Sequence, residues 1–471
     1  MAAPIGETAA AATPAANAPS PELVEASNRF SEGDFEGAAN LLREAGKKNP
    51  DLPPAQVILA RMFLQSNLQA EGRAEARRRL ERAVVEDRND PSAYMMLGDF
   101  ALREGRITEA ELAFEKVRSL LPKFEKSAKQ KSDIEMSLCS DMASVNEARE
   151  EWAEARNQLE ALLKLDPDNS MVMQRLAHCL VRQKNVTEAL KILQKAAKVD
   201  AEMLTPEAIL ARLCEQAGDR ESARKYMAMA LLVAPKNIKT RVVAARWAFD
   251  TGQLEEALSQ TNVALKLDEK SLDAKILRGM IAAFQKDYRT AERYSEEAHL
   301  QARDNFVASN NLALALVEQK DETKKRRAWQ YADENVKKFP RSPEALSTYG
   351  WVLYKMERLD EAEGALRAAI QGSAFNADTA YYLARVDLDR HREVEARALL
   401  KTALDEPGLF AMRQEAKALL DQLNKTQLNK TQLNKSQPVN EQPAIEPAAK
   451  GAPLKESSAK EPPAKEEPAK K

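Results

Sequence analysis

Residues 90–122 read DPSAYMMLGDFALREGRITEAELAFEKVRSLLP, and the rest of the chain varies this pattern. Apolar residues recur at three- and four-residue spacing on both sides of a polar turn, which is typical of two amphipathic helices. Gly105 suits the end of the first helix because glycine adopts a left-handed conformation without a steric penalty. Pro122 ends the second helix because proline has no N–H with which to continue it. The stretch therefore predicts a helical hairpin.

The same hairpin pattern recurs along the chain, for example in residues 205–235 and 342–370. One alanine marks the second helix of each unit, and seven of the ten gaps between successive members of the series are 34 residues. A fixed period of this length indicates a repeat protein, in which neighbouring units stack and bury a continuous core. The series is Ala38, Ala76, Ala110, Ala155, Ala189, Ala223, Ala257, Ala291, Ala328, Ala362 and Ala396.

These units resemble the tetratricopeptide repeat family, whose 34-residue pattern has a small residue at position 8, a turn glycine near 15 and alanine at 20. Position 8 is glycine at Gly98, Gly279 and Gly350, and alanine in the other units. The turn glycines are Gly33, Gly105, Gly218 and Gly252. The resemblance covers residues 19–409 as about eleven repeats. It implies an all-α fold, a right-handed α-solenoid of helix-turn-helix repeats, with disordered N- and C-terminal tails.

The domain organisation follows from where the repeat pattern holds and where it breaks. Residues 125–135 form a lysine-rich insertion without glycine or proline, which we expect to extend a helix. Residues 410–423 predict a capping helix that covers the last apolar face of the array. The Ala/Pro-rich residues 1–18 and the Pro/Ala/Lys/Glu tail at 424–471 contain too few apolar residues to form a core, so we expect both to be disordered.

Composition excludes several classes of protein. The formal net charge of −2 gives no general attraction to nucleic acid or anionic membranes. No run approaches the ~18 apolar residues of a membrane span. Three widely spaced cysteines do not form a disulfide framework, which favours a reducing compartment. We expect a cytoplasmic protein, or a periplasmic or exported one if an upstream signal segment is missing.

Motifs for catalysis, cofactor or metal binding are absent from the sequence, so it predicts no enzyme and no cofactor. His178 and Cys179, with Cys214 one repeat later, could meet on neighbouring helices. Structural zinc needs four ligands, so we interpret these thiols as core-filling side chains.

The resemblance implies that the first helix of each repeat lines a concave groove, with positions 2, 5, 6, 9, 12 and 13 exposed. In repeats five to seven these positions hold mainly basic residues, and in repeats eight to eleven mainly apolar and aromatic ones. The alternative is that the charges only solvate a helix and that Trp351 packs inside. The candidate groove residues are Arg175, His178, Arg182, Arg212, Lys239, Arg246, Ile276, Met280, Asn310, Asn311, Leu314, Trp351, Tyr354, Tyr381 and Arg385.

Function is expected to lie in this groove. Exposed apolar groups with Trp, Tyr and Arg are the usual anchors of protein interfaces. The sequence therefore predicts a scaffold or adaptor whose protein or peptide partner has an acidic stretch next to an apolar one. The family's carboxylate clamp is not reproduced, because Glu344 occupies a place where that clamp has lysine. A role in assembling a cell-envelope or secretion complex is the alternative.

Overall fold

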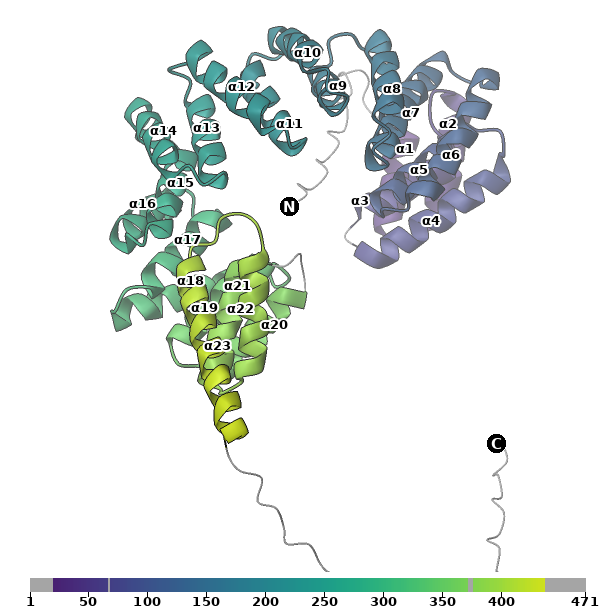
Figure 1. The fold of residues 1–471 in the computed structure, drawn as a ribbon. Helices are drawn as coiled ribbons and strands as arrows, with labels where there is room; N and C mark the ends of the chain where they lie inside the picture. The colour runs from purple at the N-terminus through teal and green to yellow at the C-terminus, as the bar shows by residue number, and fades with distance from the viewer. Residues whose placement is uncertain (1–19, 67, 372–375, 437–471) are drawn as a thin grey trace, which may run out of the picture.

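A computed structural model describes residues 20–66, 68–371 and 376–436, and all regular elements within them are helices (Figure 1). The helices form consecutive antiparallel pairs. The first helices of the pairs are α1 (Pro21–Ser31), α3 (Ala55–Gln65), α5 (Pro91–Arg103), α7 (Ala128–Ala148), α9 (Ser170–Arg182), α11 (Pro206–Gln216), α13 (Ile238–Asp250), α15 (Leu272–Phe284), α17 (Phe306–Val317), α19 (Pro343–Lys355) and α21 (Ala377–Asp389). The second helices are α2 (Phe35–Lys48), α4 (Gln69–Glu86), α6 (Ile107–Leu120), α8 (Trp152–Leu165), α10 (Val186–Val199), α12 (Arg220–Val233), α14 (Leu254–Leu267), α16 (Tyr288–Gln301), α18 (Glu322–Lys338), α20 (Leu359–Gln371) and α22 (Glu393–Asp405).

A 3₁₀ turn, η1 (Leu121–Lys123), follows α6, and a last helix, α23 (Arg413–Ser436), follows the final pair. The pairs α1–α2 to α21–α22 fit the eleven predicted repeats, and the all-helical solenoid is confirmed. They stack side by side into an open arch (Figure 1). The first helices α9, α11 and α13 lie on its inner side, and the second helices α10, α12 and α14 lie on its outer side.

In nine of the eleven helix pairs the hairpin turn has the same backbone hydrogen bonds. In the third pair, the N–H of Arg106 donates to the carbonyl of Ala101 at 2.8 Å and that of Gly105 to Leu102 at 3.0 Å. This is a Schellman motif, which needs a left-handed residue at the position of Gly105, where φ is 73°. Five pairs make the same turn without glycine. The residues with positive φ there are Glu150, Lys184, Lys286, Glu357 and His391, all with φ between 60° and 64°.

The small residues of the repeat lie where two helices of a pair cross. The eleven alanines of the series are all at most 1% exposed. A Cβ built on Gly98 would lie 2.3 Å from Cε1 of Phe114, and one on Gly350 would lie 2.6 Å from Cγ of Leu366. Both distances are too short for real atoms, so a larger residue would push the two helices apart. The predicted reason for the small residues, close approach of the helices, is confirmed.

Two segments depart from the regular stacking. Residues 128–135 of the insertion form the first two turns of α7, and Gln130 Nε2 donates to the carbonyl of Asp51 at 2.9 Å. The extension thereby contacts the beginning of the second repeat.

At the other end, α23 continues past the predicted boundary at residue 424 as far as Ser436. The prediction that disorder begins at 424 is wrong. Residues 424–436 contain no glycine or proline, so nothing there ends the helix, and proline occurs next at 438. The predicted tail at 1–18 and residues 437–471 of the predicted tail at 424–471 lie outside the described residues.

Candidate functional site: a cleft on the concave face

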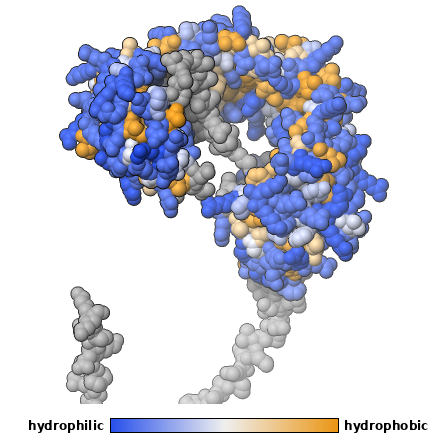
Figure 2. Space-filling model, turned by 180° about the vertical axis from the view of Figure 1, so that it is seen from behind, coloured by the Kyte–Doolittle hydropathy of each residue, from blue (hydrophilic) through white to orange (hydrophobic). Residues whose placement is uncertain are grey.

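The concave face is hollowed where α11, α13 and α15 lie next to each other. The cleft has a volume of about 540 Å³. Seen from behind, hydrophobic side chains gather on the upper right part of the arch, the region of α11–α14 (Figure 2). Three first helices of successive repeats supply the walls, so equivalent positions of each repeat face the same space. The lining residues are Arg212, Glu215, Gln216, Val242, Val243, Arg246, Trp247, Asp250, Thr251, Asp273 and Ile276.

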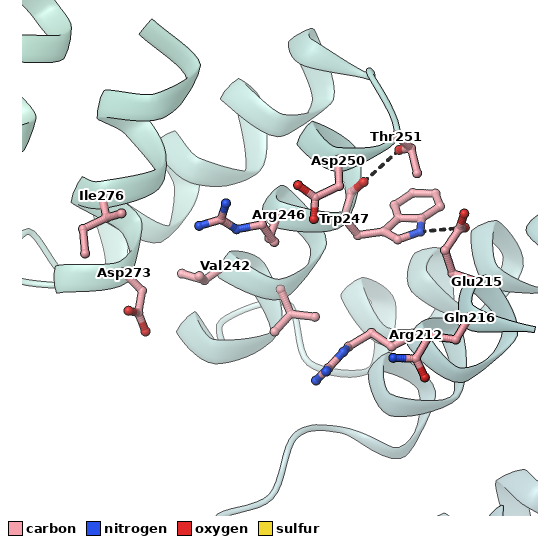
Figure 3. A pocket seen from close by; sticks show the side chains of 11 residues that line it. Arg212, Glu215, Gln216, Val242, Arg246, Trp247, Asp250, Thr251, Asp273 and Ile276 are labelled. Carbon is pink, nitrogen blue, oxygen red and sulfur yellow. Dashed lines mark hydrogen bonds between the residues drawn. The ribbon is translucent and has the colours of Figure 1, made fainter. Parts of the chain in front are cut away.

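Two arginines give the cleft its positive side. Arg212 on α11 and Arg246 on α13 occupy the same position of successive repeats, 34 residues apart. Within the described ranges neither side chain forms an ion pair, and the one hydrogen bond of the Arg246 guanidinium goes to Sδ of Met280 at 3.4 Å. Most of their N–H groups are thus available to an anionic group. Figure 3 shows both guanidinium groups extending away from the ribbon into the open space.

The acidic residues of the cleft are held differently. Nε1 of Trp247 donates to Oε2 of Glu215 at 3.1 Å, a bond that links α13 to α11 (Figure 3). Arg220 also lies 3.8 Å from Glu215. Asp250 is one turn beyond Arg246 on α13, and Asp273 begins α15 at the far edge. The lining is therefore mixed in charge rather than uniformly basic.

Four of the predicted basic groove residues are already neutralised by their neighbours. Nη2 of Arg175 lies 3.0 Å from Glu147 and also donates to the hydroxyl of Ser144 at 2.8 Å. These contacts join α9 to α7. Arg182 forms an ion pair with Glu150 at 3.2 Å, and its guanidinium lies over the ring of Trp152 at 4.5 Å from the ring centroid. Lys239 forms an ion pair with Glu202 at 2.9 Å.

His178 is the fourth of these residues. Its ring packs edge-on against Trp152 with the ring centroids 5.1 Å apart. Burial lowers the pKa of His178 below its usual 6.5, so the ring is neutral at pH 7. His178, Arg212 and Arg246 occupy the same position of three successive repeats, and of these three predicted groove residues only the two arginines of the cleft are cationic at pH 7.

The apolar part of the predicted groove is largely core. Trp351 and Tyr381 are each 2% exposed, so the prediction that they are exposed anchors is wrong. Trp351 lies between the rings of Tyr354 and Tyr382, at centroid distances of 5.0 and 4.2 Å, and its Nε1 donates to Glu318 at 2.6 Å. Aromatic residues of two successive repeats thus stack on each other and leave no free face.

The remaining predicted residues are also engaged in the core or largely buried, some of them beside this aromatic cluster. Arg385 donates to the hydroxyls of Tyr354 and Tyr381, both at 3.1 Å. Leu314 packs against the same core, and Met280 packs against the core of α13 and α15. Asn310 is buried, with 9% exposure, and Asn311 is half-buried. Within the described part of the chain, the buried Oδ1 of Asn310 and Nδ2 of Asn311 form no hydrogen bond. The cleft lining includes none of Tyr354, Tyr381, Arg385, Leu314, Met280, Asn310 and Asn311.

Of the apolar floor of the cleft, sequence reasoning found Ile276 but missed two valines. Val242 and Val243 occupy positions 5 and 6 of the repeat, which the register already assigned to the concave face. They were overlooked because only charged and aromatic side chains were singled out there. Trp247 is at position 10, which the register assigned to the core, and its edge reaches the cleft through the bond to Glu215.

The cysteines are core residues. Cys179 and Cys214 are 0% exposed, and burial raises their thiol pKa values to about 12 and about 11. Thiols with such pKa values are not nucleophiles at neutral pH. No three His, Cys, Asp or Glu side chains in the described ranges lie close enough together to hold a metal ion. None of the described helices has the length and apolarity that a bilayer crossing requires.

Residues 65–123 and 148–213 each match a family model described as tetratricopeptide repeat. These segments of the chain carry tetratricopeptide repeats. Among curated protein sequences, none matches it.

Solved structures similar to this protein include yeast Tom70, at 12% identity over 88% of this chain and 98% of that chain, with a TM-score of 0.38. The APC/C hetero-tetramer Cut9-Hcn1 matches at 12% identity over 85% and 95%, with a TM-score of 0.41. YrrB, described as a repeat protein with an unusual peptide-binding site, matches at 21% identity over 42% and 97%, with a TM-score of 0.28. At these identities and scores, the family assignment depends on the two matching segments and on the helix pairs.

Proposed function

We propose that this protein is a non-enzymatic interaction scaffold that holds a segment of a partner protein on its concave face, in the cleft between α11, α13 and α15. The observation that supports this function most is the pair Arg212 and Arg246. Arg212 is exposed and Arg246 is half-buried, and neither forms an ion pair within the described ranges, so their guanidinium N–H groups can donate charge-assisted hydrogen bonds to carboxylates of a ligand.

The cleft also offers what protein interfaces use for affinity. Val242, Val243 and Ile276 provide an apolar floor, and charged residues stand around it. An apolar centre with a polar rim is the usual anatomy of an interface. The fold belongs to a family whose members bind protein or peptide partners.

A displayed library of random dodecapeptides, panned against the full chain, tests this function. We expect enrichment on the wild-type protein and loss of enrichment on Val243→Arg, which fills the cleft with a long charged side chain. Lys225→Ala, on the outer helix α12, is the matched control and should retain the same peptides. Absence of any enriched peptide, or equal retention by Val243→Arg, would contradict the proposal.

A further inference from the structure

We infer that the cleft recognises a polyproline-II segment of about six residues, with two acidic side chains three residues apart and an aliphatic side chain between them. This inference deepens the proposed function and depends on it. It differs from the pattern expected from sequence, in which an acidic stretch is followed by an apolar one.

The spacing of the two arginines selects the backbone conformation of the ligand. Arg212 and Arg246 are equivalent residues on neighbouring first helices, and such helices pack about 8–10 Å apart. A polyproline-II helix has three residues per turn and rises ~3.1 Å per residue, so its every third side chain points the same way after about 9.3 Å. In a β-strand the third side chain points to the opposite face. Acidic residues three apart on a polyproline-II segment therefore match both arginines.

The apolar floor places the aliphatic residue. Val242 lies four residues before Arg246 on α13, so both side chains emerge on the same face of that helix. Ile276 continues the apolar row on α15. When the carboxylates of a ligand bind the two arginines, the ligand side chains between them lie over the apolar row of Val242 and Ile276. One aliphatic side chain there buries apolar surface on both molecules.

The two exposed acidic residues of the cleft weaken the binding of a ligand that is acidic along its whole length. Asp250 and Asp273 are exposed at its margins and form no ion pair within the described part of the chain. Like charges close together are unfavourable, so additional carboxylates on the ligand would meet repulsion at these two positions. Spaced acidic residues should therefore bind better than a continuous acidic run.

Contacts within the chain limit the length of the site. On the side of α9, the guanidinium of Arg175 is engaged by Glu147 and Ser144 of α7 and is not available to a ligand. On the side of α15, Leu409 from the segment after α22 packs against the core of α13 and α15, and Lys286 pairs with Glu415 at the start of α23. Three first helices remain open, and they span two helix spacings, about 16–20 Å. That length fits about six residues of polyproline II.

The probe is a fluorescein-labelled peptide amide, Ala-Glu-Leu-Pro-Glu-Ala, titrated with the full chain and followed by fluorescence anisotropy. Its two glutamates are three residues apart, and the proline favours polyproline II. Replacing Arg212 or Arg246 by glutamine should weaken binding roughly tenfold each, because each change removes charge-assisted hydrogen bonds. Arg224→Gln, on the outer side of α12, should bind like wild type. Binding should also weaken as salt rises.

Three control peptides separate the parts of the inference. Glutamine in place of both glutamates should abolish binding, and hexaglutamate should bind more weakly than the probe. A peptide with its glutamates four residues apart should also bind more weakly.

Equal binding of all four peptides, or no effect of either arginine substitution, would overturn the ligand pattern. If the displayed library still yields peptides that depend on Val243 but not on the arginines, the scaffold function stands and this inference fails. If the library yields none, the proposed function fails as well.

Discussion

Replacing Gly98 by alanine should destabilise the third helix pair, although alanine is the better helix former. In an exposed helix the change from glycine to alanine stabilises by about 1 kcal/mol. At position 98 the new Cβ would lie 2.3 Å from the ring of Phe114, which is 0% exposed and cannot move into solvent. Overpacking of this kind costs about 1–3 kcal/mol. The net effect is therefore a loss of roughly 0–2 kcal/mol of unfolding free energy.

Gly364 provides the matched control because it lies within α20 and a Cβ there would have no atom within 4 Å. Gly364→Ala should stabilise by about 0.5–1 kcal/mol. Hydrogen exchange is the suitable assay, since repeat arrays unfold in parts and a single global midpoint is not well defined. Peptides from α5 and α6 should lose protection in Gly98→Ala, and those from α20 should gain it in Gly364→Ala. Equal gains at both sites would refute the close approach of α5 and α6.

Two further predictions concern single residues with unusual backbone or charge. Lys184 has a φ of 64° in a hairpin turn, so Lys184→Gly should relieve a strained left-handed residue and increase the hydrogen-exchange protection of α9 and α10, whereas Gly218→Ala at the equivalent turn should reduce that of α11 and α12. Burial, with a smaller contribution from Asp99, raises the pKa of Asp141 to about 7 from its usual 3.8. The folded protein thus holds the proton on Asp141 more tightly than the unfolded chain does. The stability that this protonation contributes is lost as pH rises from about 4 to about 7. Asp141→Asn should therefore increase the hydrogen-exchange protection of α7 and α8, corrected for the intrinsic exchange rate, more at pH 8 than at pH 4.5, and an equal effect at both pH values would contradict this.

The fold could be predicted from the sequence because the repeat constrains each position many times over. A buried alanine such as Ala257 recurs at the same point of every unit, so chance matches are averaged out. The end of α23 could not be placed in this way. It depends on the absence of a helix-breaking residue before Pro438, whereas the prediction relied on low hydrophobicity.

The site was harder to predict than the fold. The register identified which positions face the concave side, and Arg212 and Arg246 were found by it. It could not show which of those side chains are already engaged, because the partners come from neighbouring repeats. Arg175 is paired across a helix boundary with Glu147, and Trp351 is enclosed by Tyr382 of the next repeat. Exposure in the groove is thus a property of adjacent repeats together, which no single repeat encodes.

The segment between α22 and α23 links distant parts of the array. Two adjacent residues contact helices more than a hundred residues apart. Leu409 packs against the core of α13 and α15, while Phe410, 4% exposed, packs edge-on against Tyr381 of α21 at a centroid distance of 6.1 Å. In a regular solenoid each repeat contacts only its neighbours, so this contact adds coupling that the repeats themselves do not provide.

Leu409→Ser should therefore weaken α13 and α15 although the substitution lies far away in sequence. The hydroxyl removes the apolar contact and leaves the loop intact, because Arg413 still donates to the carbonyls of Leu404, Glu406 and Gly408. Hydrogen exchange in residues 238–284 should rise in Leu409→Ser and stay unchanged in α9. Leu428→Ser is the control, since that leucine lies on α23 and is 62% exposed. If both variants leave residues 238–284 as protected as in the wild type, the segment does not bind there, and the concave face beyond α15 is open to a partner.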